Sequence, residues 1–157
     1  MSTTVSCLII SCSATKCLER GPAILVYCGR LFQVIKKQLP RLDVFILSAK
    51  HGLISAEQEI EKYDQRIEDK TWTDEDLTRQ IVELGVNKNY IKIHLCMSEA
   101  YVLALLTPLL DVAQDWQFVF RIAKGQSIGY MQTELKEFCL KYQEGDIPSW
   151  HKLVSLE

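Results

Sequence analysis

Lys50 and His51 place an amine next to an imidazole, in the segment SAKHG that begins at Ser48. Histidine titrates near neutral pH, and a neighbouring lysine lowers the pKa of an imidazole by charge repulsion, which favours the neutral ring. A neutral imidazole can accept a proton, so His51 is a candidate general acid or base with Lys50 beside it. Ser48 and Gly52 are candidate ligand contacts, because Gly52 lets the backbone turn and come close to a ligand. The alternative for this segment is an ordinary solvated exit from a strand.

Polar residues gather at three further places where an apolar run ends. Hydroxyl groups, lysines, glycine turns and free backbone N–H groups at helix starts suit a phosphate or another anion. The candidate ligand contacts in these segments are Ser11, Ser13 and Lys16 in SCSATK, Ser98 in SEA, and Gly125, Ser127 and Gly129 in KGQSIG. Together with SAKHG, these segments predict one pocket for a phosphate or a nucleotide.

Three other residues are candidates for the chemistry of such a pocket. Cys12 is one of them. Apart from His51, a cysteine with a perturbed pKa is the group at these strand ends that can titrate near neutral pH. Tyr27 could stack on a base, with packing in the core as the alternative. Asp64 could act as a carboxylate nucleophile or orient a sugar if its acidic loop folds back, with a solvated loop acid as the alternative.

Four apolar runs rich in β-branched and aromatic residues indicate strands that are buried on both faces, as in a parallel sheet. They span residues 5–11, 43–48, 91–97 and 117–123. Segments with helical periodicity alternate with them, at residues 29–39, 73–85, 99–110 and 130–142. Thr73 with Asp76 forms a variant of the capping box, and Ser98 is a good N-cap for the helix that follows it.

This alternation predicts a single α/β domain over residues 1–157, with a three-layer α/β/α sandwich and a mainly parallel sheet of about four strands. Right-handed crossovers place the carboxyl ends of parallel strands at one edge of the sheet, where ligands bind at the topological switch point. The polar segments should therefore meet at that edge. The last stretch, with Pro148, Trp150 and His151, is expected to pack as a tail.

The composition narrows the classes of protein. The chain has 157 residues, of which 48% are hydrophobic and 24% charged, and its formal net charge is −2. It lacks the basic excess of proteins that bind nucleic acid mainly through phosphates, so DNA or RNA would have to bind at a local site. The start, MSTTVSC, has no positively charged region before its short apolar run, and no apolar stretch approaches the ~20 residues of a membrane span. We therefore expect a cytoplasmic protein without a membrane partner.

The six cysteines form neither a CxxC pair nor a CxxC…HxxxH arrangement. In a cytosolic setting this argues against disulfides and against a metal site, and no cofactor is predicted either. Cys7 lies in an apolar strand, and Cys28, Cys96 and Cys139 are predicted to be small core residues. His94, in the middle of a strand, is expected to be a core histidine whose hydrogen bonds are satisfied.

Two other interpretations of the motifs fit the sequence less well. GQSIG matches the G-x-S-x-G nucleophile elbow of serine hydrolases in a strand-to-helix context. However, only Asp146 and His151, in an unpatterned tail, remain to complete a catalytic triad. A Rossmann dinucleotide site is excluded, because no GxGxxG follows the first strand.

The segments CSATK, YCGRLF, LSAKHGLI and KYD lie between residues 5 and 65. In sequence and spacing they resemble the motifs SCSxxK, YxxxLF, SAKHGLL and YD of a small, poorly characterised family of bacterial and phage domains. The CSxxK signature also resembles the core of archaeosine synthase, a relative of tRNA-guanine transglycosylase that acts on a 7-deazaguanine base, and the fold is similar to that of the peroxide-stress proteins of the YaaA type. The resemblance implies nucleobase or nucleic-acid modification, with Cys12, Ser13 and Lys16 as site residues. Archaeosine synthase has a Pro-Tyr-Ser segment where this chain has Cys17-Leu18, so lysine transfer to a deazaguanine is not implied.

The sequence thus predicts a protein that binds a nucleotide or another nucleobase-containing ligand. The first interpretation is an enzyme, a transferase or hydrolase of the glycosidase or transglycosylase type that acts at a nucleobase or an N-glycosidic bond. The second is a non-catalytic nucleotide or nucleic-acid binding module of a stress or defence system. A purely structural role ranks third, because an interaction protein has little need for polar residues at four strand ends. The oligomeric state is left open.

Overall fold

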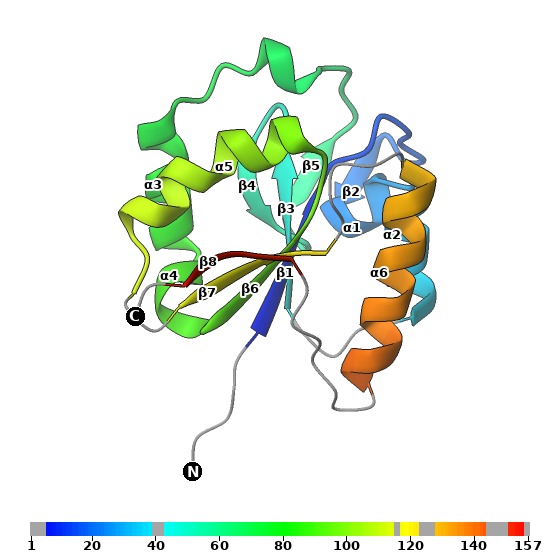
Figure 1. The fold of residues 1–157 in the computed structure, drawn as a ribbon. Helices are drawn as coiled ribbons and strands as arrows, with labels where there is room; N and C mark the ends of the chain where they lie inside the picture. Colours follow the sequence, from blue (N-terminus) through cyan, green and yellow to red (C-terminus); the bar gives the residue numbers. More distant parts are fainter. Residues whose placement is uncertain (1–5, 39–42, 115–116, 123–127, 144–150, 156–157) are drawn as a thin grey trace.

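The computed structural model describes residues 6–38, 43–114, 117–122, 128–143 and 151–155. At its centre is a six-stranded sheet with the order β4-β3-β1-β6-β7-β8 (Figure 1). The four central strands are parallel: β1 (Ser6–Ser11), β3 (Asp43–Ser48), β6 (Lys92–Cys96) and β7 (Phe118–Arg121). They confirm the four strands that the apolar runs predict.

Helices cover both faces of the sheet. On one face lie α2 (Arg30–Gln38) and α6 (Ile128–Gln143), and on the other lie α3 (Asp74–Glu83) and α5 (Glu99–Asp111) (Figure 1). Successive residues of β1 alternate between two cores: Leu8 and Ile10 pack with α2 and α6, whereas Cys7 and Ile9 pack with α3 and α5. None of the helices in the described part of the chain has the length and apolar character that crossing a membrane would need. Because both faces are covered, the central strands are mainly apolar, and the predicted three-layer α/β/α sandwich is confirmed.

The strand order makes β1 the switch point of the sheet. From β1 the chain passes through α2 to β3 on one side, and it later reaches β6 on the other side of β1, from which α5 leads to β7. The loops after β1 and β6 therefore diverge to opposite faces of the sheet. In open α/β sheets, ligands bind at the carboxyl ends of two such strands.

Both edges of the sheet carry an antiparallel strand that was not predicted. β4 (Gly52–Ser55) turns back against β3, so SAKHG forms the turn of a β-hairpin and is not an open strand exit. β8 (His151–Ser155) pairs with β7, so His151 begins a strand and is not part of a tail, whereas Pro148 and Trp150 lie outside the described residues. The remaining short elements are the paired strands β2 (Arg20–Pro22) and β5 (Glu59–Glu61), the helices α1 (Ala23–Val26) and α4 (Val86–Asn89), and a 3-10 turn at Ile67–Asp69.

The two predicted helix caps have different outcomes. At the start of α3, Thr73 Oγ1 accepts a hydrogen bond from the Asp76 N–H at 3.2 Å, and Asp76 Oδ2 accepts one from the Thr73 N–H at 2.9 Å. This reciprocal pair confirms the capping box. Ser98 occupies the N-cap position of α5, but its side chain makes no capping hydrogen bond.

The prediction that the chain forms no disulfide is wrong. Cys17 and Cys28 are joined by a disulfide, with their Cα atoms 6.0 Å apart. They meet because Lys16 and Tyr27 pair in an antiparallel bridge, which the sequence spacing does not reveal. Cys28 is therefore half of a cross-link and not a small core residue. The buried free cysteines are Cys7, Cys96 and Cys139, as predicted.

His94 is buried, as predicted, but the described residues do not satisfy its hydrogen bonds. Its side chain is fully buried, and its ring centroid lies 5.3 Å from that of Phe120 and 4.8 Å from that of Phe138. Neither ring nitrogen has a hydrogen-bond partner in the part of the chain that the structure describes. Burial, with a smaller contribution from the positive charge of Lys92, lowers the pKa of His94 to about 4. The ring is therefore neutral at physiological pH.

Candidate functional site

The carboxyl edge of the sheet brings together segments that are far apart in the sequence. The loop after β1 carries Cys12 and Lys16, the β3–β4 turn follows Ser48 and carries His51, and Tyr63 comes from the loop after β5. This last loop folds back over the edge, because Tyr63 OH lies 2.7 Å from Ser48 Oγ. Tyr63 is thus held at the centre of the predicted site.

Three hydroxyl groups form a triangle at this edge. Tyr63 OH lies 2.6 Å from Tyr27 OH and 2.7 Å from Ser48 Oγ, and Tyr27 OH donates a hydrogen bond to Ser48 Oγ at 3.3 Å. Burial raises the pKa of Tyr27 to about 12 and also raises the pKa of Tyr63, so both phenols stay protonated near neutral pH. The Tyr27 side chain is fully buried against Phe32 and offers no face to a base. The predicted stacking role of Tyr27 is therefore replaced by its alternative, packing in the core.

Ser48 holds the turn that carries Lys50 and His51. Its Oγ accepts hydrogen bonds from the backbone N–H of Lys50 at 3.2 Å and of His51 at 3.1 Å. Trp72 Nε1 donates to the carbonyl oxygens of Ser48 and Ala49, each at 3.1 Å. Because the Ser48 side chain is fully buried, it positions the turn and does not itself face a ligand, in contrast to the predicted contact.

Basic side chains surround the Tyr63 ring. Lys16 Nζ lies 4.4 Å from the ring centroid and Lys50 Nζ lies 5.6 Å from it, both within the range of cation–π attraction. The His51 ring meets the Tyr63 ring edge-on, with 5.5 Å between the centroids. We refer to the following residues as the Tyr63 cluster: Lys16, Tyr27, Ser48, Lys50, His51 and Tyr63.

The imidazole and one amine of the Tyr63 cluster have lowered pKa values. For His51 the larger cause is burial, and the second is repulsion from Lys50, the effect that the sequence predicts. Burial also lowers the pKa of Lys16, and the proximity of Cys12 and Asp64 opposes this effect. His51 Nε2 is buried and has no hydrogen-bond partner among the described residues. A neutral imidazole is thus present at the site, and no described residue bonds to one of its ring nitrogens.

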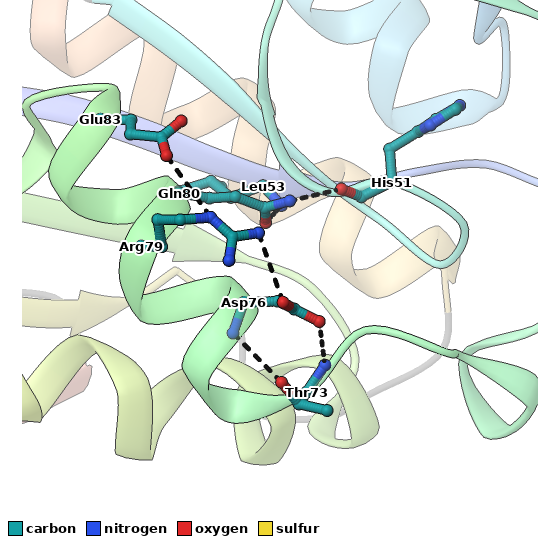
Figure 2. A network of polar contacts seen from close by, with 7 residues as sticks. All are labelled: His51, Leu53, Thr73, Asp76, Arg79, Gln80 and Glu83. Atoms are coloured by element: carbon teal, nitrogen blue, oxygen red, sulfur yellow. Dashed lines mark hydrogen bonds and ion pairs between the residues drawn. The ribbon is translucent and has the colours of Figure 1, made fainter.

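Gly52 does allow another group to come close to the backbone, as predicted, but that group is the Gln80 side chain of the same protein and not a ligand. It has φ of +78°, and a Cβ atom at this position would lie 2.2 Å from Gln80 Oε1. Gln80 Oε1 accepts a hydrogen bond from the Leu53 N–H at 2.8 Å, and Gln80 Nε2 donates to the His51 carbonyl at 2.9 Å. Figure 2 shows this clamp, with the His51 ring pointing away from Gln80. The predicted ligand contact at Gly52 is thereby corrected to a structural role, because Gly52 lets α3 hold the hairpin turn.

A pocket of about 450 Å³ opens between the loop after β1 and the start of α2. Residues 11–15 and 29–32 line it, and we call it the Ser13 pocket. Ser13 Oγ donates a hydrogen bond to the Thr15 carbonyl at 2.7 Å and accepts one from the Gly29 N–H at 3.2 Å. A Cβ atom at position 29 would lie 2.6 Å from Ser13 Cβ, so glycine permits this approach. Arg30, the exposed first residue of α2, also lines the pocket and was not predicted.

Cys12 lies between the Ser13 pocket and the β3–β4 turn that carries Lys50 and His51. It lines the Ser13 pocket, and its Sγ accepts a hydrogen bond from the Ala49 N–H of the β3–β4 turn at 3.4 Å. The same sulfur lies 3.4 Å from the hydroxyl of Tyr101 on α5. Burial, followed by the proximity of Cys12, raises the pKa of Tyr101, so this phenol is protonated near neutral pH. The Cys12–Tyr101 contact joins the loop after β1 to the helix after β6 across the switch point.

A model of a protein family of unknown function, DUF6884, matches residues 7–133. The chain belongs to this family. No curated protein and no solved structure matches the chain. The DUF6884 region contains the whole Tyr63 cluster, the residues that line the Ser13 pocket, and the four parallel strands that position them. The site described above is therefore a feature of the family part of this chain.

The remaining predicted site residues of this DUF6884 chain do not all lie in the Tyr63 cluster or the Ser13 pocket. Gly125 and Ser127 lie outside the described residues, so their role as ligand contacts stays a prediction. Gly129 belongs to the first turn of α6. Ser11 is buried and lines the Ser13 pocket, and its role as a ligand contact stays a prediction. Asp64 is exposed, yet it is close enough to Lys16 to influence the pKa of the amine.

Some residues of the site were not found by sequence reasoning. In the described part of the DUF6884 chain, no three His, Cys, Asp or Glu side chains gather as a metal site would require. The polar groups that do gather include Tyr63, Arg30 and Tyr101, none of which was predicted as a contact. Tyr63 had a signal, because it stands in the KYD motif beside Asp64. Arg30 and Tyr101 had none, because single polar residues in a first helical turn are usually solvated.

Proposed function

We propose that this DUF6884 protein binds a nucleotide or another nucleobase-containing ligand at the carboxyl edge of its sheet, and that it is an enzyme acting on the base or on its N-glycosidic bond. The observation that carries the proposal is the 3.4 Å contact between Cys12 Sγ and Tyr101 OH, with the Ser13 pocket beside it. The contact marks the switch point between β1 and β6, and this is the position at which open α/β sheets bind nucleotides.

The Ser13 pocket supplies groups that suit a phosphate. The first N–H groups of α2 have no carbonyl partner within the helix, and the helix dipole favours an anion at that end. Arg30 adds an exposed guanidinium at the same place, which can bind two phosphate oxygens at once. Lys16 and Lys50 add positive charge in the Tyr63 cluster. A phosphate in this pocket would place the rest of a nucleotide near Cys12.

The Tyr63 cluster supplies groups that suit proton transfer. His51 is neutral near pH 7 because its pKa is lowered, and its buried Nε2 has no partner among the described residues, so the ring can still take up a proton. Asp64 is exposed and near enough to Lys16 to raise the pKa of its amine, and a carboxylate there can orient a sugar hydroxyl or attack a sugar carbon. The resemblance of CSATK to the archaeosine synthase signature supports a nucleobase as the reacting group. Acid–base chemistry at a glycosidic bond is the reaction class that uses these groups together.

A non-catalytic binding module is the second candidate, and one observation favours it. The hydroxyl groups of Tyr27, Ser48 and Tyr63 bond to one another, and Ser48 also holds the backbone of the turn. In a binding module these groups would keep the edge rigid, and the Ser13 pocket would hold the ligand without turnover.

Calorimetry with nucleoside 5′-monophosphates, the matching nucleosides and inorganic phosphate tests the proposal. We expect a nucleotide to bind more tightly than its nucleoside, because the Ser13 pocket holds the phosphate. Incubation with the same compounds and with short DNA or RNA, followed by mass spectrometry, then detects a released or altered base. Binding without any altered product would favour the binding module. If none of these compounds binds, the proposal is wrong.

A further inference from the structure

The Cys17–Cys28 disulfide lies directly beside the candidate site. Cys17 follows Lys16 in the chain and Cys28 follows Tyr27, and Lys16 and Tyr27 are the two partners of an antiparallel bridge. Backbone hydrogen bonds from the N–H groups of Cys17 and Cys28 flank this bridge, at 2.9 and 3.1 Å. The disulfide therefore closes the pairing that places Lys16 over the Tyr63 ring.

The two sides of this pairing are held very differently. Tyr27 is fully buried, its hydroxyl bonds to Ser48 and Tyr63, and its carbonyl accepts a hydrogen bond from Lys36 Nζ at 3.2 Å. It would stay in place without the disulfide. The segment of residues 14–20, by contrast, is exposed at every position except the half-buried Lys16.

Backbone hydrogen bonds anchor the Lys16 segment at its two ends as well as beside the Lys16–Tyr27 bridge. The Cys12 N–H donates to the Leu47 carbonyl at 3.0 Å, and the Glu19 carbonyl accepts from the Lys62 N–H at 2.8 Å. The Lys16 amine donates only within its own loop, to the Ala14 carbonyl at 3.3 Å, among the hydrogen bonds of the described residues. Between these two ends, Lys16 is held by the bridge with its two flanking backbone hydrogen bonds, and the disulfide is the covalent constraint on this pairing.

We propose that the Cys17–Cys28 disulfide is a redox switch for the candidate site. In the oxidised protein Lys16 is held over the Tyr63 ring, and the site binds its phosphorylated ligand. In the reduced protein the Lys16 segment moves away, while Tyr27, Ser48 and Tyr63 keep their positions. The inference rests on the proposed function, because it names the regulation of the same site.

The switching step is thiol–disulfide exchange with a dithiol reductant. A thiolate of the reductant attacks the sulfur of Cys17, which is exposed, and the bond between the two cysteine sulfurs breaks so that Cys28 leaves as a thiolate. The second thiolate of the reductant then attacks the mixed disulfide, forms the reductant's own disulfide and releases the Cys17 thiolate. Two electrons pass from the dithiol to the protein, and both cysteines take up protons from water. A small-molecule disulfide reverses the step by the same exchange.

Ligand affinity in the two redox states measures the switch. We expect the oxidised protein to bind a nucleoside 5′-monophosphate about tenfold more tightly than the protein reduced with dithiothreitol, the usual worth of one charge-assisted contact. Alkylation of free thiols followed by mass spectrometry verifies the state of each sample. Lys16→Ala should bind as weakly as the reduced parent and should no longer respond to dithiothreitol. Lys37→Ala, which removes a lysine from the exposed side of α2, should keep the full response.

Amide hydrogen exchange provides a second measurement that needs no ligand. Reduction should speed exchange of the Cys17 and Cys28 N–H groups, whose hydrogen bonds belong to the cross-linked pairing, and leave that of the Leu53 N–H unchanged. Cys28→Ser should show the same pattern without reductant, and the reduced parent supplies this state if the variant does not fold.

The outcomes separate this inference from the proposed function. A nucleotide that binds equally to the oxidised and reduced protein would overturn the switch and leave the proposed function standing. If no nucleotide binds to the oxidised protein, the proposed function fails. In that case, unchanged exchange at Cys17 and Cys28 after reduction would overturn the structural basis of the switch as well.

Discussion

His51 and His94 both have lowered pKa values, yet they lie in opposite kinds of surroundings. His94 is fully buried between Phe120 and Phe138 in the core beneath α6, whereas His51 is half-buried at the carboxyl edge, next to Tyr63. Burial is the main cause of the lowered pKa in both cases. A lowered histidine pKa therefore does not by itself mark a catalytic residue. What distinguishes His51 is its access to an edge where other polar groups gather.

The largest expected effect separates the two histidines by activity. If the protein is an enzyme, His51→Gln should lower turnover by roughly 10²–10⁴, the usual worth of a positioned general acid or base, and keep ligand affinity within a few-fold. The assay is mass spectrometry of the reaction products under saturating ligand. Turnover that survives the substitution intact would show that another group is the catalyst.

The pH profile of turnover gives a matched test of the same histidine. Repulsion from Lys50 contributes to the low pKa of His51, so Lys50→Ala should raise this pKa. A general base works in its deprotonated form, and the acidic limb of the rate profile should therefore move to higher pH. An unchanged acidic limb would argue that the limb belongs to a different group.

His94 should affect stability and not activity. The unfolded chain binds a proton at His94 below about pH 6.5, whereas the folded protein does so only below about pH 4. Between these values the unfolded state binds more protons, so lowering the pH through this window destabilises the fold, by up to about 3 kcal/mol at its lower end. Urea unfolding at several pH values measures this loss, and His94→Phe should remove that part of it. A variant with the same pH dependence as the parent would contradict the assignment.

A smaller effect should distinguish a serine that builds the edge from one that lines the pocket. Ser48→Ala should cost about 2 kcal/mol of unfolding free energy, because it leaves two backbone N–H groups without their acceptor and removes one of the two hydroxyl contacts of Tyr27 and of Tyr63. Ser13→Ala should cost about 1 kcal/mol, because Ser13 is less buried and its hydroxyl makes two hydrogen bonds, one from the Gly29 N–H and one to the Thr15 carbonyl. Urea unfolding measures both values. The reverse ranking would mean that the Tyr63 cluster does not hold the turn.

The sequence was sufficient to predict the parallel strands, because each one is a mainly apolar run that both layers of helices bury. It was not sufficient for β4, since GLIS is short and follows a turn whose polar residues look like a strand exit. The disulfide was missed because Cys17 and Cys28 are 11 residues apart and meet only through the pairing of Lys16 with Tyr27. Such pairings depend on tertiary structure and leave no periodic signal.

For the candidate site, too, the sequence predicted which residues lie at the edge but not which side chains contact them. His51, Cys12, Ser13 and Lys16 were predicted from their place at strand ends, and the structure brings them to one edge. The side chains that contact the turn and the loops at this edge come from elements that only packing brings close. Gln80 of α3, which lies against Gly52, is an example. A sequence pattern places a polar residue at the edge, but it does not tell whether the residue faces a ligand or another side chain.

The central claim is that the Ser13 pocket holds a phosphate at the start of α2, and Arg30 tests it most directly. Arg30 and Lys37 are both exposed on α2, but Arg30 lines the pocket at the first turn and Lys37 lies in the last turn. Calorimetry with a nucleoside 5′-monophosphate should show that Arg30→Ala binds roughly 10- to 100-fold more weakly than the parent, as expected for the loss of a charge-assisted contact. Lys37→Ala should bind like the parent. Equal affinity of Arg30→Ala and the parent, with the nucleotide bound in both, would contradict the claim.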